Sequence, residues 1–159
     1  MDMNDELDRL RKSVMESYKN KKNSEEYHLL KHHNIVLFKE DLDDEEYHYS
    51  KFFHQPMNKT DYLNRILKIN PDLTKAYQEI KRYYYFNHCW YKYTPLEALD
   101  YLNSLINEWY LSDNKCLIKL AGTLDSWKQY IANSFIPYVK HNGEVTRLSN
   151  GKIEEKTPT

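Results

Sequence analysis

Glycine and proline, the residues that tight turns most often require, are scarce in this chain. Three glycines and five prolines are spread over 159 residues. All-β sandwiches and barrels use many such turns, because each pair of short strands has to be joined by one. The scarcity therefore argues against those folds and favours long helices.

Apolar residues recur every three or four positions over most of the chain, as in amphipathic helices. Leu7, Leu10 and Val14 begin the pattern in a helix over about residues 3–20. Further helices are predicted over about residues 24–38, 60–70, 71–84, 95–111 and 114–136. We therefore expect an all-α fold, a helical bundle of about six helices, with a short irregular C-terminal tail from Glu144.

Polar side chains that can accept hydrogen bonds from free backbone N–H groups mark several helix starts. The predicted capping residues are Asn23 or Ser24, Asn70, Thr94 and Asp113. The stretch Thr94-Pro95-Leu96-Glu97 also has the form of a capping box. Trp109 and Trp127 lie on apolar stripes, so we expect both in the core.

Two stretches are less regular. The apolar run Ile35–Phe38 suits a buried strand as well as a helix, and we expect a helix because no clear second strand is present to pair with it. The acidic run Glu40–Glu46 lacks the glycine and the distal glutamate of a calcium-binding loop. We expect that run to be a solvated loop.

Charge and composition limit the function. Basic and acidic residues nearly cancel, with a net charge of −1, so any contact with nucleic acid needs a local patch. Residues 81–92 are such a candidate, because Lys81, Arg82 and Lys92 alternate with aromatic residues that could stack on bases. If this segment is helical, at least half of its aromatic rings must pack inside the protein, which we expect to be their main role.

Metal, disulfide and membrane sites are not predicted. Cys89 and Cys116 are too few for a disulfide framework or a zinc cluster. His28 and His32 share one helix face, but no third metal ligand accompanies them. The polar, acidic start is unlike a signal peptide, and no run approaches the ~20 apolar residues of a membrane helix. We expect a cytoplasmic protein with no membrane partner.

Four stretches together resemble one family of enzymes. They are ELDRLRKSVMESYK followed by EEYHLLKHHNIVLFK, then NPDLTKAYQEIKRYYY, then Ala121-Gly122-Thr123-Leu124 with Trp127, and finally Arg147-Leu148-Ser149-Asn150-Gly151-Lys152-Ile153-Glu154. In order and spacing they resemble the DDE transposases of the ISL-three insertion-sequence family. The resemblance covers nearly the whole chain.

The resemblance implies DNA as partner and a ribonuclease-H-type active site. In such enzymes three carboxylates hold two Mg²⁺ ions, which activate a nucleophile and stabilise the leaving oxygen during DNA strand cleavage and transfer. The third carboxylate of the family corresponds to Glu154, in its Ser-Asn-Gly-x-x-Glu signature. Glu154 is thus the single catalytic and metal-binding position that the resemblance assigns here.

Departures from the family pattern suggest a truncated copy. The first two carboxylates of the family precede the stretches matched here, and Glu155 and Thr157 stand where the family has glycine and asparagine. We expect residues 1–143 to be the helical region between the second and third carboxylates, and residues 144–159 to be a tail carrying the remnant of the third. One carboxylate cannot hold two hard cations, so we expect this chain to bind no metal and to lack catalysis.

Two other classes of function remain open. The chain could be a small helical module that binds DNA or protein, including an intact transposase or a second copy of itself. It could also be a helical protein unrelated to transposases.

Overall fold

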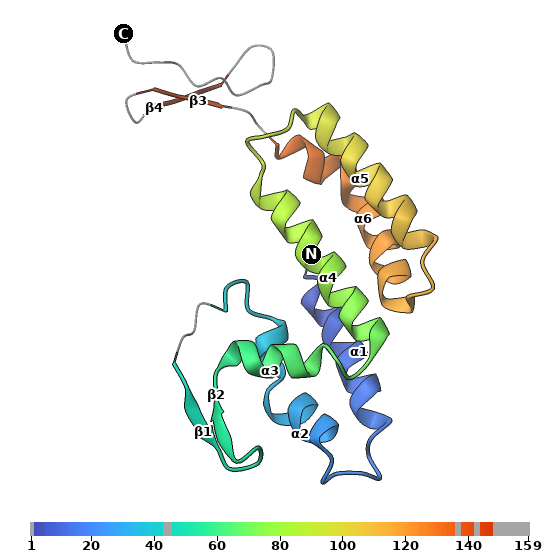
Figure 1. Ribbon diagram of the computed structural model, residues 1–159. Helices are drawn as coiled ribbons and strands as arrows, with labels where there is room; N and C mark the ends of the chain where they lie inside the picture. The colour runs from blue at the N-terminus through green and yellow to red at the C-terminus, as the bar shows by residue number, and fades with distance from the viewer. Residues whose placement is uncertain (1, 43–45, 136–137, 142–143, 148–159) are drawn as a thin grey trace. The chain divides into compact units, whose positions relative to one another are not determined.

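The computed structural model describes residues 2–42, 46–135, 138–141 and 144–147. Six α-helices and one 3₁₀ helix make up most of the described residues, together with two small antiparallel hairpins (Figure 1). The predicted fold, mostly helical with six helices, is confirmed, whereas neither hairpin was predicted. No helix among the described residues is both long and apolar enough to span a bilayer.

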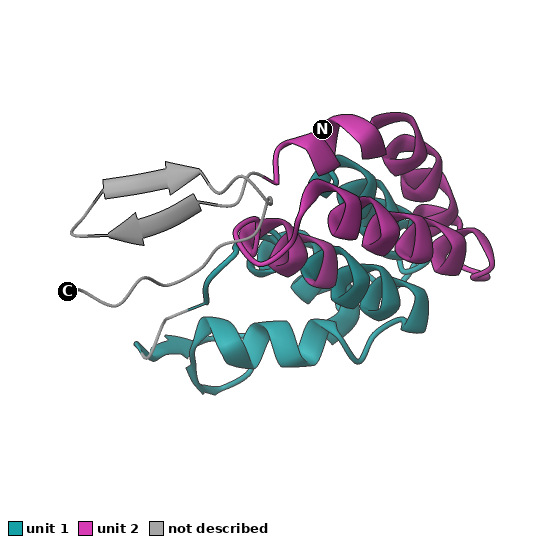
Figure 2. Cartoon of the chain, turned by 90° about the horizontal axis from the view of Figure 1, so that it is seen from above, with its two compact units in different colours: residues 1–81 teal, residues 82–159 magenta. Residues whose placement is uncertain are grey.

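Two compact units divide the chain, residues 1–81 and residues 82–159 (Figure 2). The boundary lies inside helix α4 (Pro71–His88). The division predicted at residue 143 falls on residues 142–143, which lie outside the described residues.

Unit 1 contains α1 (Asn4–Glu16), α2 (Glu25–His32), the 3₁₀ helix η1 (Asn34–Leu37), the hairpin β1 (His48–Ser50) and β2 (Gln55–Met57), α3 (Lys59–Ile66), and the start of α4. Its elements bury one set of apolar side chains, which includes Leu7, Val14, Leu29, Leu30, Val36, Leu37, Met57, Leu63 and Ile66. The helix expected for the run Ile35–Phe38 is therefore found, although in the tighter 3₁₀ form.

A buried arginine links the first two helices. Arg11 is 7% exposed, and its Nε donates a hydrogen bond to Oδ1 of Asp8 at 2.8 Å. Its Nη1 donates to the backbone carbonyl of Leu30 at 2.7 Å. The guanidinium thus satisfies a carbonyl of α2 from α1, which fixes the contact between the two helices.

The hairpin β1–β2 pairs His48 with Met57, Tyr49 with Pro56, and Ser50 with Gln55. Its turn, residues 51–54, ends in His54, whose φ of 55° lies in the left-handed region. Histidine is among the non-glycine residues enriched in that conformation. Sequence periodicity missed this hairpin because each strand has only three residues.

Unit 2 contains the end of α4, α5 (Pro95–Tyr110), α6 (Lys115–Asn133), and the hairpin β3 (Tyr138–His141) and β4 (Glu144–Arg147). Helices α5 and α6 pack against each other along their length (Figure 1). Between them lie buried side chains, among them Ala98, Leu102, Leu105, Ile106, Trp109, Leu117, Leu120, Ala121 and Leu124.

The prediction for Trp109 is confirmed, and that for Trp127 is wrong. Trp109 is 1% exposed, whereas Trp127 is 50% exposed. A rotation of about 100° per residue turns Trp127 roughly 60° away from Leu124, to the margin of the apolar stripe. There the indole packs edge-on against Tyr130, with ring centroids 5.8 Å apart.

Helix caps follow the sequence closely. Ser24 accepts a hydrogen bond from the Tyr27 N–H, Asn70 from Leu73, and Thr94 from Glu97, as predicted. The cap of α6 is Asn114 and not Asp113, since the Asn114 side chain accepts from the Leu117 N–H at 3.1 Å. A reciprocal capping box between Asn58 and Asp61, which was not predicted, begins α3.

Strand β4 occupies the first four residues of the region expected to be an irregular tail, and residues 148–159 lie outside the described residues. It pairs with β3 so that Tyr138 lies opposite Arg147 and His141 opposite Glu144. Asn142-Gly143 stands between the strands in the sequence, a dipeptide typical of two-residue hairpin turns. That signal would have predicted the hairpin.

Helix α6 contains a glycine close to α5. A Cβ atom added to Gly122 would lie 3.6 Å from the hydroxyl oxygen of Tyr110. This is an ordinary van der Waals distance, so packing alone does not require glycine here.

Candidate nucleic-acid interface

The aromatic residues of α4 divide between the interior and the surface, as predicted. Tyr83 and Phe86 are 4% and 3% exposed, whereas Tyr85 is 69% exposed. Phe86 stacks on Tyr101 at 4.1 Å and on Phe135 at 4.8 Å between ring centroids. Burial, with a contribution from Tyr84, raises the pKa of Tyr83 to about 12. Tyr83 and Phe86 are therefore packing residues.

Lys81 is held within unit 1. Its Nζ donates a hydrogen bond to the backbone carbonyl of Lys39 and lies 5.6 Å from the centre of the Tyr77 ring. Burial lowers the pKa of Lys81, while the charges of Glu40 and Asp41 oppose that shift. The Lys81 ammonium thus already has acceptors within its own unit.

Arg82 is held within unit 2 by an ion pair. Its Nη1 lies 2.8 Å from Oε2 of Glu108 on α5, and its guanidinium lies 6.0 Å from the centre of the Tyr101 ring. The hydrogen bond to Glu108 is the main cause that raises the pKa of Arg82. Binding a phosphate would require the guanidinium to share or exchange this carboxylate.

Lys92 differs from the other two cations of the predicted patch. It is exposed, follows the end of α4, and lies 5.9 Å from the centre of the Tyr91 ring. Tyr91 in turn meets Trp90 edge-to-face, and the two rings are 44% and 41% exposed. Lys92 and its aromatic neighbours face solvent, as do Arg82 and Tyr85, but Arg82 is already paired with Glu108.

Glu154 lies outside the described residues, so the structure does not place it. Within the described ranges no three side chains of His, Cys, Asp or Glu converge as a metal site would require.

A cluster of histidine and aromatic rings lies in unit 1. His28 stacks on Phe52 at 3.9 Å with the ring planes 5° apart, and His33 stacks on Tyr62 at 3.8 Å and 7°. His32 lies 5.0 Å from His28. Burial and the neighbouring histidines lower the pKa of His28 and bring that of His33 to about 4. The imidazoles of His28 and His33 therefore serve as packing groups, stacked in parallel on aromatic rings.

The same contacts hold the turn of the β1–β2 hairpin against the helices. Phe52 and Phe53 follow β1 and meet edge-to-face at 5.0 Å. Arg65 of α3 places its guanidinium 4.5 Å from the centre of the Phe53 ring, and Phe53 N–H donates to the hydroxyl oxygen of Ser50. The hairpin turn is thereby attached to both α2 and α3.

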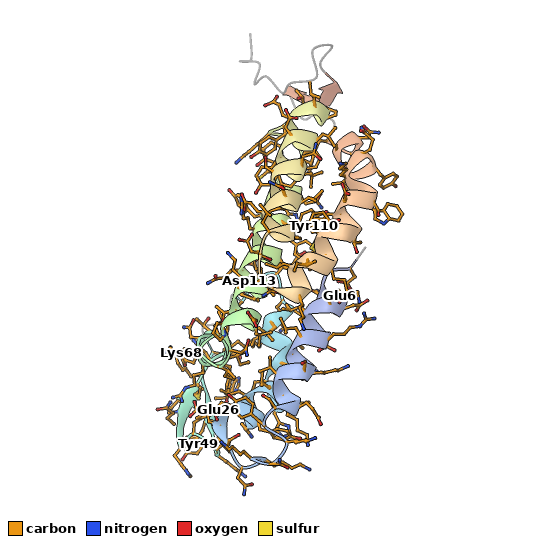
Figure 3. The ribbon with its side chains drawn as sticks, turned by 90° about the vertical axis from the view of Figure 1, so that its right-hand side faces the viewer. Glu6, Glu26, Tyr49, Lys68, Tyr110 and Asp113 are labelled. Carbon is orange, nitrogen blue, oxygen red and sulfur yellow. The ribbon has the colours of Figure 1, made fainter. Side chains whose placement is uncertain are left out.

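The two faces of this hairpin differ. Residues opposite each other in an antiparallel pair lie on one face, and neighbours along a strand alternate. Met57 and Ser50 are buried, at 1% and 8% exposure, which marks the inner face. Tyr49 is 65% exposed and pairs with exposed Pro56 on the other face (Figure 3). Tyr47, 60% exposed, directly precedes β1. We call Tyr47, Tyr49 and Pro56 the outer face of the hairpin.

Two hollows also lie in unit 1. One, of about 460 Å³, is lined by Glu25, Glu26, Leu29, Arg65, Lys68 and Ile69. Among the lining residues, Arg65 forms an ion pair with Glu25, with Nη1 2.8 Å from Oε1. The other, of about 250 Å³, lies on the inner side of the hairpin near His33, Met57 and Tyr62.

Sequence reasoning missed the outer face. The alternation of Tyr47 and Tyr49 with polar residues was the available signal, because a period of two is typical of a strand with one exposed face. It extends over too few residues to stand out beside the acidic run.

Comparison with known proteins identifies the family. The chain matches the family model of the ISL-three DDE transposases, described as transposase, over residues 2–155. No curated protein and no solved structure gives a significant match. Because the family match extends over nearly all of the sequence, this chain belongs to the ISL-three family of transposases.

Proposed function

We propose that this chain takes part in DNA transposition by contacting DNA in the cytoplasm, and that by itself it does not cleave DNA. The family match over residues 2–155 carries the first part of the proposal, because an insertion-sequence transposase acts on DNA. The second part depends on the carboxylates that metal-dependent strand transfer needs.

Glu154 is the position that the family's Ser-Asn-Gly-x-x-Glu signature matches. Two-metal catalysis requires several oxygen ligands that hold two Mg²⁺ ions about 3.5–4 Å apart. Glu154 alone supplies at most two of those oxygens. In the proposal it is a remnant of the third carboxylate, able to serve as a ligand only beside carboxylates from elsewhere.

A nicking assay tests the catalytic part. A supercoiled plasmid is incubated with the full chain and Mg²⁺, and the variant Glu154→Gln serves as the matched control. We expect no conversion to the nicked form by either protein. Nicking by the parent chain that disappears in Glu154→Gln would show that the chain is catalytic and would contradict this part of the proposal.

The contact with DNA includes the patch predicted from the sequence, Lys81, Arg82 and Lys92. The internal hydrogen bonds of Lys81 and the ion pair of Arg82 support a larger share for Lys92, which is exposed beside the Trp90 and Tyr91 rings. A lysine that contacts one phosphate contributes about one unit to the salt dependence of binding.

A gel shift with duplex DNA tests this contact. Lys92→Ala is expected to weaken binding and to reduce the salt slope by about one. Lys115→Ala, which removes an exposed lysine at the start of α6, is the matched control and is expected to bind like the parent. A parent chain that binds no DNA would contradict the proposed contact.

The second proposed partner is a protein, either a further copy of this chain or an intact transposase. Trp127 and Tyr130 on α6 are 50% and 73% exposed and touch each other. Large exposed apolar side chains that lie together are typical of interaction surfaces. We include self-association through these two rings in the proposal.

A further inference from the structure

We infer that the outer face of the β1–β2 hairpin, formed by Tyr47, Tyr49 and Pro56, binds unpaired DNA bases by stacking. This deepens the proposed function, because it rests on DNA as the partner and names the form of DNA that this surface recognises.

The two tyrosine rings of the outer face are exposed to solvent. Tyr47 and Tyr49 are 60% and 65% exposed, and exposed Pro56 lies opposite Tyr49 in the strand pairing. A tyrosine ring presents an apolar face while its hydroxyl remains hydrated. Such rings are the usual platforms for nucleobases, since every base has a π-face.

The hairpin is attached firmly enough to present these rings in one place. Its turn is fixed by the His28–Phe52 stack at 3.9 Å and by Arg65 over the Phe53 ring at 4.5 Å. Its inner face buries Met57 against unit 1. An isolated two-stranded hairpin would be marginally stable, so these contacts pre-order the outer face before a ligand arrives.

The surrounding charges favour bases over a long stretch of phosphate backbone. Glu46 directly precedes Tyr47 and would repel a phosphate chain at the base of the hairpin. Lys51, at the opposite end in the turn, is exposed and forms no ion pair among the described residues. One cation at the tip suits one phosphate beside a stacked base, whereas a duplex backbone would extend towards Glu46 as well.

The experiment uses the full chain and a short single-stranded DNA that contains 2-aminopurine, whose fluorescence falls when it stacks on an aromatic ring. The parent is expected to quench the probe with a salt slope near −0.7, the value for one phosphate contact on a single strand. Tyr47→Ala/Tyr49→Ala is expected to abolish the quenching and to weaken binding about fivefold to a hundredfold.

Two further variants serve as controls. Tyr47→Phe/Tyr49→Phe keeps both rings and should bind like the parent, which separates stacking from hydrogen bonding. Tyr110→Ala removes a tyrosine that is 44% exposed in unit 2 and should also behave like the parent. Circular dichroism confirms folding, which both sets of changes should preserve because the altered side chains are exposed.

The outcomes separate this inference from the proposed function. If the parent shifts duplex DNA and Lys92→Ala weakens that shift, but no variant of Tyr47 or Tyr49 alters the quenching, the hairpin inference is overturned and the proposed function stands. If the alanine variant changes only the association state of the chain, the outer face binds protein and the inference is likewise overturned. A parent that binds neither form of DNA overturns both.

Discussion

Single histidine and arginine side chains hold unit 1 together by lying flat against rings or by filling backbone acceptors. His33 stacks on Tyr62 and His28 on Phe52, each with nearly parallel planes. A neutral imidazole makes such a stack without the cost of burying a charge. The protonation state of these residues is therefore coupled to the packing of the hairpin and α3.

The lowered pKa of His33 leads to a prediction of how the stability of the fold depends on pH. Burial, with the nearby His28 and His32, lowers its pKa from 6.5 to about 4 in the folded chain. Between these values the unfolded chain binds the proton more readily, so the stability present above pH 6.5 is lost progressively as the pH falls towards 4. The midpoint of thermal unfolding should decrease over this range.

The variant His33→Phe tests that assignment, because it keeps a ring against Tyr62 and removes the titrating group. Its unfolding midpoint should depend less on pH than that of the parent. A smaller slope remains from His28, whose pKa is lowered for the same reasons. An unchanged slope in His33→Phe would assign the pH dependence to other groups.

For single residues, the sequence predicts local hydrogen bonds at helix caps better than contacts between residues far apart in the chain. Ser24, Asn70 and Thr94 cap their helices as expected, because a cap depends on residues three positions apart. The His28–Phe52 stack joins residues 24 positions apart, and no local pattern encodes it. The same limit explains why the internal partners of Lys81 and Arg82 were not foreseen.

At the scale of elements, contacts between neighbouring helices depend on a few buried polar links as well as on apolar stripes. Arg11 is the clearest case, since it joins α1 to a carbonyl of α2 while pairing with Asp8 in its own helix. Burial alone would raise the pKa of Asp8, but hydrogen bonds and charges from Arg11 and Lys12 outweigh it and lower the pKa.

Replacing Arg11 should destabilise the α1–α2 pair. Arg11→Ala leaves the Leu30 carbonyl without its donor and removes the main partner of Asp8, so we expect a loss of about 2 kcal/mol or more in the free energy of unfolding. Arg9→Ala is the matched control, because Arg9 pairs with Glu6 on an exposed side and should cost less than about 1 kcal/mol. Urea unfolding of both variants measures the difference, and equal losses would contradict the linking role of Arg11.

Helices α1, α4, α5 and α6 were predictable as elements because their apolar period repeats over three or more turns. Strands β1 and β2, at three residues each, offer only one alternation. The prediction that the run Ile35–Phe38 is helical was correct. The reason given for it was wrong, because strands are present nearby that could have been its partners. The hairpin β1–β2 lies only about ten residues further along the chain.

For the whole molecule, the sequence identifies the family more readily than the site. The resemblance depends on the order of several stretches, and the family match from residue 2 to residue 155 confirms it. The candidate interface depends instead on which rings remain exposed after folding. Trp127 shows why this is hard to predict, because it follows the apolar spacing of α6 and is nevertheless half exposed.

Self-association would change the mass of the protein in solution. If Trp127 and Tyr130 form the contact, the apparent mass in size-exclusion chromatography with light scattering should increase with concentration for the parent. The double variant Trp127→Gln/Tyr130→Gln should remain at the mass of one chain. Leu96→Gln, which alters a side chain that is 69% exposed on α5, is the matched control and should associate like the parent. Association that persists in the double variant would place the contact elsewhere.

The glycine inside α6 offers a practical opportunity. A methyl group on Gly122 would rest against the Tyr110 hydroxyl at a comfortable separation, while a helix interior gains roughly 0.5–1 kcal/mol when glycine becomes alanine. Gly122→Ala would therefore stiffen the helical hairpin without rearranging it. The Gly122→Ala variant would give crystallisation and DNA-binding trials a more stable starting protein whose surface is otherwise unaltered.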